Sequence, residues 1–355
     1  MLSADVIKKL QSLKLPWPGA VAWKRALHND AAACGVTYRG LTAGRKDEFA
    51  IITYHRVLEK PDPDYGFAFG IRLSVFERQL AMFHRFGSVR PLDEILDRIE
   101  QGKPLPPRCI ALTFDDGYRD VLTRAWPLLL RYKLPATLYV AVDALERGFL
   151  WPDVVQAAIQ RTRSNHLVLE ALKASPPRAF EFSDPRQRLM AVWRLNALLT
   201  DLSNEKKQEL LRELTWKLLR VSPEEIPFPG LMLTWEELKE LAAGGMTIGA
   251  HTVSHPILTR VSQEQAQQEI LQSRQLLEER VGIPVRHFCY PNGRAQDFSP
   301  EIERMVEASG YRSACTTIRG INTLRSDRFA LRRIHGEQKS VRELVRVLAE
   351  EAIAA

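Results

Sequence analysis

Short runs of apolar residues recur along most of this chain, and helical patterns separate them. Charged or turn-forming residues bound each run. Continuous apolar runs of this kind are typical of parallel strands that are covered on both faces. We therefore predict an α/β fold with a parallel sheet or a barrel. The predicted strands comprise residues 50–55, 109–114, 136–141, 246–250, 286–290 and 311–316.

Helices are predicted between these strands. Residues 74–86 have apolar side chains at helical spacing. Thr234 begins a capping-box pattern, and the helix that it opens is expected to end at Gly244. A further helix is predicted to begin after Ser262 and to end near Gly282.

The alternation of strands and helices is interrupted by a long segment without an evident strand. Within it, residues 186–220 have a helical pattern whose apolar face includes Leu189, Met190, Trp193 and Leu195. This insertion could cap an active site or form a structural subdomain. The predicted units are a helical lead-in (1–48), an α/β unit (49–345) with a helical insertion at about 151–229, and a C-terminal tail (346–355).

The charge pattern narrows the choice of partners. Of 355 residues, 50 are Lys or Arg and 43 are Asp or Glu, which gives a net charge of +7. Such a balance favours an anionic partner, such as a nucleotide sugar, a lipid phosphate or a membrane surface. The alternative is that the charged residues are simply spread over the solvent-exposed faces of helices. There is no dense basic block with interleaved aromatic residues, so nucleic acid is not expected.

The sequence favours a cytoplasmic protein. Lysines at positions 8, 9 and 14 interrupt the first apolar residues, so no signal-peptide core is expected. No apolar run reaches the roughly 18 residues of a membrane-spanning helix, although the basic first helix could contact a membrane surface. The four cysteines contain no CxxC pair and are predicted to be buried and reduced.

Two acidic residues, Asp115 and Asp116, follow the predicted strand 109–114. Adjacent carboxylates at the end of a buried strand are costly unless they bind a cation or pair with one. Gly117 permits a sharp turn after them. One carboxylate could then bind a metal while the other handles protons, although Asp-Asp-Gly is also a common turn.

Two histidines, His251 and His255, follow the predicted strand 246–250. Imidazoles at this spacing can bind one ion, although such a pair also arises by chance. Both motifs lie at carboxyl ends of strands, where the active sites of barrels gather. Asp116 with the two histidines would form a two-histidine, one-carboxylate metal site, and Asp115 could take a proton from a metal-bound water.

Residues 113–118 and 251–255 resemble, in order and context, the first two motifs of the polysaccharide deacetylase family. This family is also called carbohydrate esterase family four or the NodB-homology domain. Residues 54–57 resemble a strand that opens many members, and the similarity spans roughly 48–150 and 230–336. The resemblance implies a distorted (β/α)7-type barrel and a metal-dependent hydrolase that removes acetyl groups from glycans.

The resemblance also implies roles for the motif residues. Asp115 is expected to be the catalytic base, while Asp116, His251 and His255 are expected to hold one divalent ion. This donor set suits zinc first, with cobalt, nickel and ferrous iron as alternatives. The ion would polarise the amide carbonyl and lower the pKa of its bound water.

The third family motif is altered in this chain. Cys289 stands where many members carry an arginine that orients the catalytic aspartate. We hypothesise that Arg333, from the last strand, serves instead. The resemblance further implies that the backbone N–H of Asn292 donates to the oxyanion, although residues 291–293 also suit a plain tight turn.

A general acid must protonate the leaving amine. Many family members use a histidine from a late strand, which makes His335 the first candidate. His55, at the end of the first strand, is a second candidate and could instead contact substrate or only support the site. Tyr118, in the first motif, is expected to contribute to substrate binding.

We therefore predict a metal-dependent de-N-acetylase that acts on an acetylated glycan or a carrier-linked sugar. The absence of a secretion signal favours a lipid-linked or nucleotide-linked substrate. One alternative is an amidase or deformylase on a small substrate, for which an enclosed pocket under the insertion would argue. The other is a non-catalytic glycan-binding protein, which the missing arginine of the third motif suggests.

Overall fold

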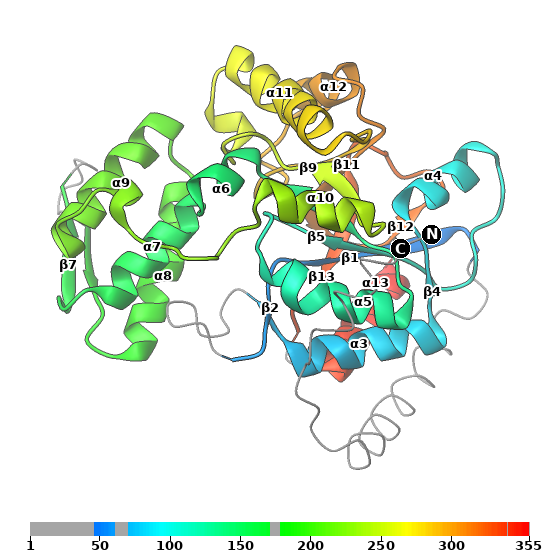
Figure 1. Ribbon diagram of the computed structural model, residues 1–355, viewed down its shortest axis with the longest axis horizontal. Helices are drawn as coiled ribbons and strands as arrows, with labels where there is room; N and C mark the ends of the chain where they lie inside the picture. The colour runs from blue at the N-terminus through cyan, green and yellow to red at the C-terminus, as the bar shows by residue number, and fades with distance from the viewer. Residues whose placement is uncertain (1–45, 61–69, 171–177, 339, 355) are drawn as a thin grey trace.

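The computed structural model describes residues 46–60, 70–170, 178–338 and 340–354 (Figure 1). The predicted lead-in, 1–48, lies almost wholly outside the described residues. Within the described ranges, none of the helices combines the length and apolarity needed to cross a membrane.

Seven parallel strands close into a barrel at the centre of the molecule (Figure 1). The ring closes because β1 pairs with β5 on one side and with β13 on the other. The predicted (β/α)7-type barrel is therefore confirmed, and all six predicted strands belong to it. In order around the barrel, the strands are β1 (Glu48–Tyr54), β13 (Leu331–His335), β11 (Ser313–Arg319), β10 (His287–Cys289), β9 (Thr247–Ala250), β6 (Thr137–Val140) and β5 (Cys109–Phe114).

The alternation of side chains in β1 explains why the strands read as continuous apolar runs. Phe49 and Ile51 belong to a cluster with inward-facing residues of the other strands. Ala50, Ile52 and Tyr54 belong to a different cluster, formed with the surrounding helices. Both faces of the strand are therefore buried, as expected for a parallel barrel.

Short strands complete the sheet. The two-residue β4 (Ser88–Val89) extends β5, and β12 (Asn322–Thr323) pairs antiparallel with β1. The equally short β2 (Val57–Leu58) and β3 (Ile71–Arg72) pair with each other. Strands of two residues have no readable periodicity, which is why the sequence did not predict them.

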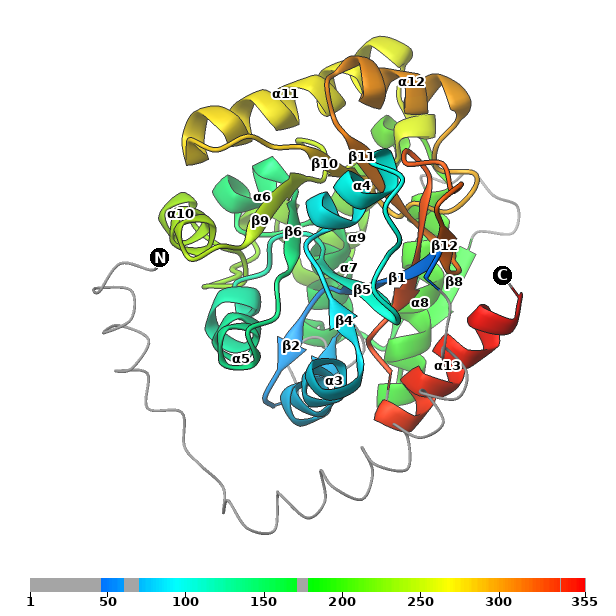
Figure 2. The same cartoon turned by 90° about the vertical axis from the view of Figure 1, so that its right-hand side faces the viewer.

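Helices surround the barrel (Figure 2). The capping box at Thr234 and the left-handed residue Gly282 delimit α10 and α11 as predicted. The surrounding helices are α3 (Leu73–Phe86), α4 (Leu92–Glu100), the π-helix η1 (Val121–Ala125), α5 (Trp126–Tyr132), α6 (Val142–Arg147), α10 (Trp235–Ala243), the 3-10 helix η3 (Leu258–Arg260), α11 (Gln263–Val281), α12 (Pro300–Ala308) and α13 (Val341–Ala354).

Residues 346–354, predicted as part of a tail, lie in helix α13. Leu344, Leu348 and Ala352 are buried and recur at a spacing of four residues, so this helix packs one apolar face on the protein. The predicted boundary between barrel and tail therefore falls within a continuous helix.

The insertion forms a unit with its own hydrophobic core beside the barrel (Figure 1, green). It also contains a two-stranded antiparallel sheet, so the prediction that this segment lacks strands was wrong. Each of these strands has only four residues, too few to show a period. The elements are α7 (Trp151–Arg161), β7 (His166–Leu169), β8 (Arg178–Glu181), α8 (Pro185–Thr200), α9 (Asn204–Leu219) and the 3-10 helix η2 (Pro223–Glu225).

The helical region 186–220 is two helices, because Ser203 caps a new helix, α9. Its predicted apolar face was also partly wrong. Leu195 is buried in the core of the insertion, whereas Leu189, Met190 and Trp193 are exposed. The break between α8 and α9 interrupts the periodicity that a single helix would have continued.

Candidate metal-binding active site

A cavity of about 530 Å³ lies at the carboxyl ends of the barrel strands. This volume is within the range of roughly 300–1,000 Å³ that is usual for small-molecule sites. Every predicted site residue lines it except Arg333, which is buried beside it. The insertion contributes part of the wall through Trp151, Trp193, Asn196 and Thr200. This lining favours the alternative in which the insertion caps the active site over the one in which it is only a structural subdomain.

A sharp turn after β5 separates the two adjacent carboxylates. Asp116 and Gly117 have φ angles of +79° and +97°, and the N–H of Gly117 donates to the carbonyl of Asp115 at 3.0 Å. A positive φ costs a residue such as Asp116 about 1–3 kcal/mol, and strain of this kind clusters at functional sites. The turn lets Asp115 and Asp116 interact with different partners.

Asp116, His251 and His255 converge on one point. Asp116 Oδ1 lies 3.5 Å from Nε2 of each histidine, and the two Nε2 atoms are 3.2 Å apart. Ligands of a tetrahedral zinc ion with bonds near 2.1 Å would be separated by about 3.4 Å. The three side chains, each nearly buried, therefore fit the donor set of a divalent cation.

The orientation of both imidazoles suits metal binding. His251 Nδ1 lies 2.7 Å from the carbonyl of Cys289, and it must donate because a carbonyl only accepts. This contact fixes the ring so that Nε2 is directed at the cluster. Burial, together with the neighbouring His251, lowers the pKa of His255 to about 3, so this ring is neutral at ordinary pH.

The loop that carries the histidines is held by hydrogen bonds. Thr252 Oγ1 accepts the N–H of His255 at 3.1 Å. The carboxylate of Glu269, in α11, accepts the N–H groups of Val253 and Ser254 at 2.8 and 2.9 Å. Glu269 was not predicted from the sequence, because nothing in its helical context distinguishes it from a surface glutamate.

Asp115 and Arg333 form a buried two-point ion pair. Arg333 Nη1 and Nη2 donate to the two carboxylate oxygens at 2.8 and 2.7 Å, and both side chains are at most 2% exposed. Burial alone would raise the pKa of Asp115, but the guanidinium outweighs it and holds this pKa well below its usual range. Arg333 thus contacts Asp115 as we hypothesised for the residue that replaces the arginine of the third motif.

Cys289 lies between the ion pair and the barrel wall. Its Sγ is 3.1 Å from Arg333 Nη2 and 3.7 Å from Asp115 Oδ2. Burial raises the pKa of this thiol, so it stays protonated. Asp115, His251 and Cys289 also lie close enough to share an ion, but Asp115 is bound to Arg333 and a neutral thiol is a poor ligand.

His55 and His335 lie at the ends of the neighbouring strands β1 and β13, and their rings stack with centroids 6.2 Å apart. His55 Nδ1 is 3.2 Å from Glu337 Oε1, and its Nε2 is 3.9 Å from Asp115 Oδ2. Burial lowers the pKa of His55, but Glu337 outweighs burial and raises it to about 10. Burial and the nearby charge of His55 lower the pKa of His335.

Glu337 was not among the predicted residues. It lies two positions beyond β13, on the edge where His55 follows the neighbouring β1. A carboxylate two positions after the last barrel strand was the signal that the sequence offered for it.

Asn292 and Tyr118 line the cavity in different ways. Asn292 has a φ of +61°, its carbonyl accepts Thr317 Oγ1 at 2.6 Å, and its backbone N–H has no acceptor among the described residues. The Tyr118 hydroxyl donates to Asp153 at 2.9 Å and so joins the β5 loop to α7. Tyr118 thereby supports the wall that the insertion provides.

The family profile described as polysaccharide deacetylase matches residues 102–169 and 199–314. These two segments make up more than half of the chain, and the chain therefore belongs to the polysaccharide deacetylase family. The unmatched residues between them, 170–198, lie inside the insertion. The family assignment and the barrel agree with the resemblance of the sequence motifs.

Individual relatives share smaller parts of the chain. The poly-beta-1,6-N-acetyl-D-glucosamine N-deacetylase of Escherichia coli K12 is 36% identical over 90 residues, which is 25% of this chain and 13% of that protein. The match thus spans only a small part of this relative.

Two solved structures show the same fold at low identity. The deacetylase PplD of Streptococcus pyogenes, in complex with acetate, has a TM-score of 0.56 at 18% identity, covering 86% of this chain and 98% of its own. IcaB from Ammonifex degensii has a TM-score of 0.54 at 18% identity, covering 86% and 97%.

Proposed function

We propose that this protein is a metal-dependent hydrolase that removes N-acetyl groups from the sugars of a glycan. The observation that carries the proposal is the convergence of Asp116, His251 and His255 beside a separate, ion-paired Asp115. Membership of the polysaccharide deacetylase family supports the reaction class, and the N-deacetylase activity named for the Escherichia coli relative supports the amide bond as the target.

The three converging residues would hold one divalent ion, with zinc preferred and cobalt, nickel or ferrous iron as alternatives. A bound ion would polarise the acetyl carbonyl and lower the pKa of a coordinated water. The donor chemistry fits, because one carboxylate oxygen and the Nε2 atoms of two imidazoles are directed at the same point.

Asp115 would act as the general base. Its carboxylate is ionised, and Oδ1 keeps a lone pair after accepting from Arg333, whereas Oδ2 accepts from both Arg333 and the Cys289 thiol. Arg333 is a positioning residue, since it fixes the plane of the carboxylate without lining the cavity. The unpaired N–H of Asn292 would donate to the oxygen on which negative charge develops.

Of the two candidate acids, the contacts support His55. Glu337 keeps its imidazole protonated, and its Nε2 faces the base at 3.9 Å. A proton at this atom could pass to the leaving amine. His335, whose pKa is lowered, would instead pack against the ring of His55 and line the cavity.

The alternative functions have less support. The non-catalytic interpretation depended on a missing arginine, and Arg333 supplies a guanidinium to Asp115. The wall that the insertion adds to the cavity is the feature expected for a small amide substrate, but the family and the N-deacetylase named for the Escherichia coli relative support an acetylated sugar. A lipid-linked or nucleotide-linked substrate and a cytoplasmic location stay predictions.

The proposal is tested by measuring acetate released from an N-acetylated β-1,6-glucosamine polymer and from chitooligosaccharides. The protein is used in full length and loaded in turn with zinc, cobalt and nickel. We expect acetate from at least one polymer. Stoichiometric metal without release of acetate from either polymer would contradict the proposed activity.

Metal content tests the ligand set independently of activity. We expect one equivalent of divalent metal per wild-type chain by mass spectrometry, and its loss in Asp116→Ala and His251→Ala, because each variant removes one of three protein ligands. His84→Ala, which alters an exposed histidine, is the matched control and should keep the metal. Full metal content in the ligand variants would place the ion elsewhere.

The pH dependence of activity should report the His55–Glu337 pair. In the wild type, Glu337 raises the pKa of His55 to about 10, with smaller contributions from Asp116 and Asp115, while the adjacent His335 is uncharged at neutral pH. Glu337→Gln removes the main negative charge, so the pKa of His55 should fall toward about 6.5. The alkaline limb of the kcat/KM profile should therefore move to lower pH. An unmoved limb would assign the acid to another group.

A further inference from the structure

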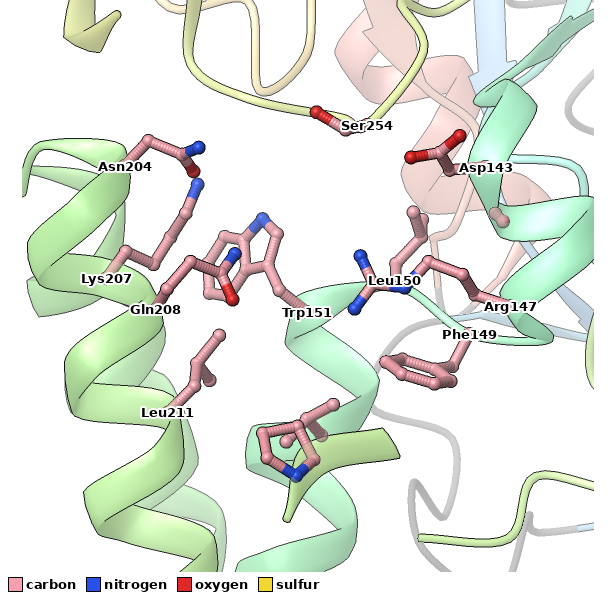
Figure 3. Close-up of a pocket in the computed structure, with 13 residues that line it drawn as sticks. Asp143, Arg147, Phe149, Leu150, Trp151, Asn204, Lys207, Gln208, Leu211 and Ser254 are labelled. Atoms are coloured by element: carbon pink, nitrogen blue, oxygen red, sulfur yellow. The ribbon is translucent and has the colours of Figure 1, made fainter. Parts of the chain in front are cut away.

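A second cavity, of about 250 Å³, lies beside the main one, between the insertion and the barrel (Figure 3). Trp151 lines both cavities. Helix α9 forms one wall, while α6 and the loop that carries Ser254 form the other. The volume corresponds to roughly eight water molecules, which is enough for one sugar ring.

The wall formed by α9 presents a buried ammonium group. Lys207 is only 2% exposed, and its Nζ lies 5.1 Å from the centre of the Trp151 ring. This Nζ donates no hydrogen bond to the described residues. Glu269 is the acidic group that influences it, but the oxygens of Glu269 accept groups of Val253 and Ser254. A buried charge without a hydrogen-bonded partner is costly, and an anion bound beside Lys207 would offset that cost.

A second donor without an acceptor faces the same space. The indole Nε1 of Trp151 is buried and has no hydrogen-bond partner among the described residues. Figure 3 shows it directed into the opening between α9 and Ser254. Asn204, the first residue of the 16-residue α9, also borders the cavity, so the positive end of the helix dipole adds to the charge of Lys207.

The charges around the cavity favour an anionic ligand that also carries hydroxyl groups. Lys207 points into the space from α9, and Arg147 and the carboxylate of Asp143 face it from α6 (Figure 3). Arg147 lies 3.5 Å from Glu224, so Lys207 is the lining cation whose ammonium group has no ion-pair partner among the described residues. Burial lowers the pKa of Lys207 to about 8, so the amine is still mostly charged at pH 7. Asp143 would repel a bare anion near it but can accept hydrogen bonds from hydroxyl groups.

We propose that this cavity binds a sugar unit that carries an anionic group, either a carboxylate or a phosphate ester. The anionic oxygens would accept hydrogen bonds from Lys207 and Trp151, and the ring hydroxyls would face Asp143. The inference rests on the proposed function only in one respect. Because Trp151 borders both cavities, the acidic sugar would neighbour the unit that is deacetylated in the main cavity.

The indole N–H signals in NMR spectra test the proposal without any catalytic step. The metal-free full-length chain is titrated with glucuronate, glucose 6-phosphate, glucose or inorganic phosphate, so that no ion in the main cavity can capture the anion. The Trp151 signal, one of seven tryptophans, is assigned by its loss in Trp151→Phe. We expect glucuronate or glucose 6-phosphate to shift this signal in a saturable manner, and glucose and phosphate to do so at least about tenfold more weakly.

Lys207→Met should weaken the binding of the acidic sugar by about tenfold or more, whereas the exposed neighbour variant Lys206→Met should not. If Lys207→Met does not fold, binding of glucuronate is followed on the ligand signals by saturation-transfer difference NMR. We then expect the transfer seen with the wild type to be lost in Trp151→Phe. Equal shifts with glucose, equal shifts with phosphate, no shift, or no effect of Lys207→Met would each overturn the proposal. None of these outcomes depends on acetate release, so the proposed deacetylase activity would stand or fall separately.

Discussion

Asp115→Asn is expected to lower kcat/KM for acetate release by about 10²- to 10⁴-fold, the usual contribution of a general base. The amide keeps the shape of the carboxylate but cannot accept the proton. The bound metal should remain near one equivalent, because Asp115 lies outside the converging ligands. Acetate release per folded, metal-loaded chain is the measurement.

Asp97→Asn is the matched control for this substitution. Asp97 is an exposed carboxylate on α4 that pairs with Arg312, so its loss removes a comparable charge away from the cavity. This control should retain wild-type activity. An Asp115→Asn enzyme with an unchanged rate and an intact metal site would show that another group takes the proton.

Arg333→Met is expected to lower the free energy of unfolding by about 3–5 kcal/mol. The substitution leaves Asp115 buried without its cationic partner. It also removes donors to the carbonyl of Thr316, at 2.6 Å, and to Thr53 Oγ1, at 2.9 Å. Urea unfolding monitored by circular dichroism measures the change.

The exposed pair of Arg304 and Glu301 supplies the control, since removing an exposed ion pair costs about 0–1 kcal/mol. Arg304→Met should therefore be nearly as stable as the wild type. The double variant Asp115→Asn/Arg333→Met should recover part of the lost stability, because it no longer buries an unpaired charge. Equal stability of Arg333→Met and the wild type would mean that the buried pair contributes nothing.

The barrel could be predicted from the sequence because a strand that is buried on both faces has apolar residues at nearly every position. In β1, Phe49 to Tyr54 are all buried, so the run is apolar without alternation. The same signal is absent from β7 in the insertion, where buried and exposed side chains alternate over only four residues. The hairpin was therefore missed, although the barrel was not.

The candidate metal ligands were predictable because they lie in the segments that follow two recognisable strands. Asp116 follows β5, and His251 follows β9, so both lie at the same end of the barrel. Glu337 was missed because its partner His55 is 282 positions away in the chain and only the closure of the barrel brings them together. The lining by Trp193 could not be predicted, since it depends on how the insertion packs beside the cavity.

The separate hydrophobic core of the insertion has a consequence for how such a site can diversify. The groups proposed for chemistry are anchored by the barrel, while Trp151, Trp193 and Lys207 are anchored in a unit that packs mainly on itself. Changes in the surface of that unit can therefore alter ligand choice without loosening the reactive carboxylates. The hydrogen bond from Tyr118 to Asp153 links the two units, so the residues of the insertion away from this contact are the ones to vary while the carboxylates are left in place.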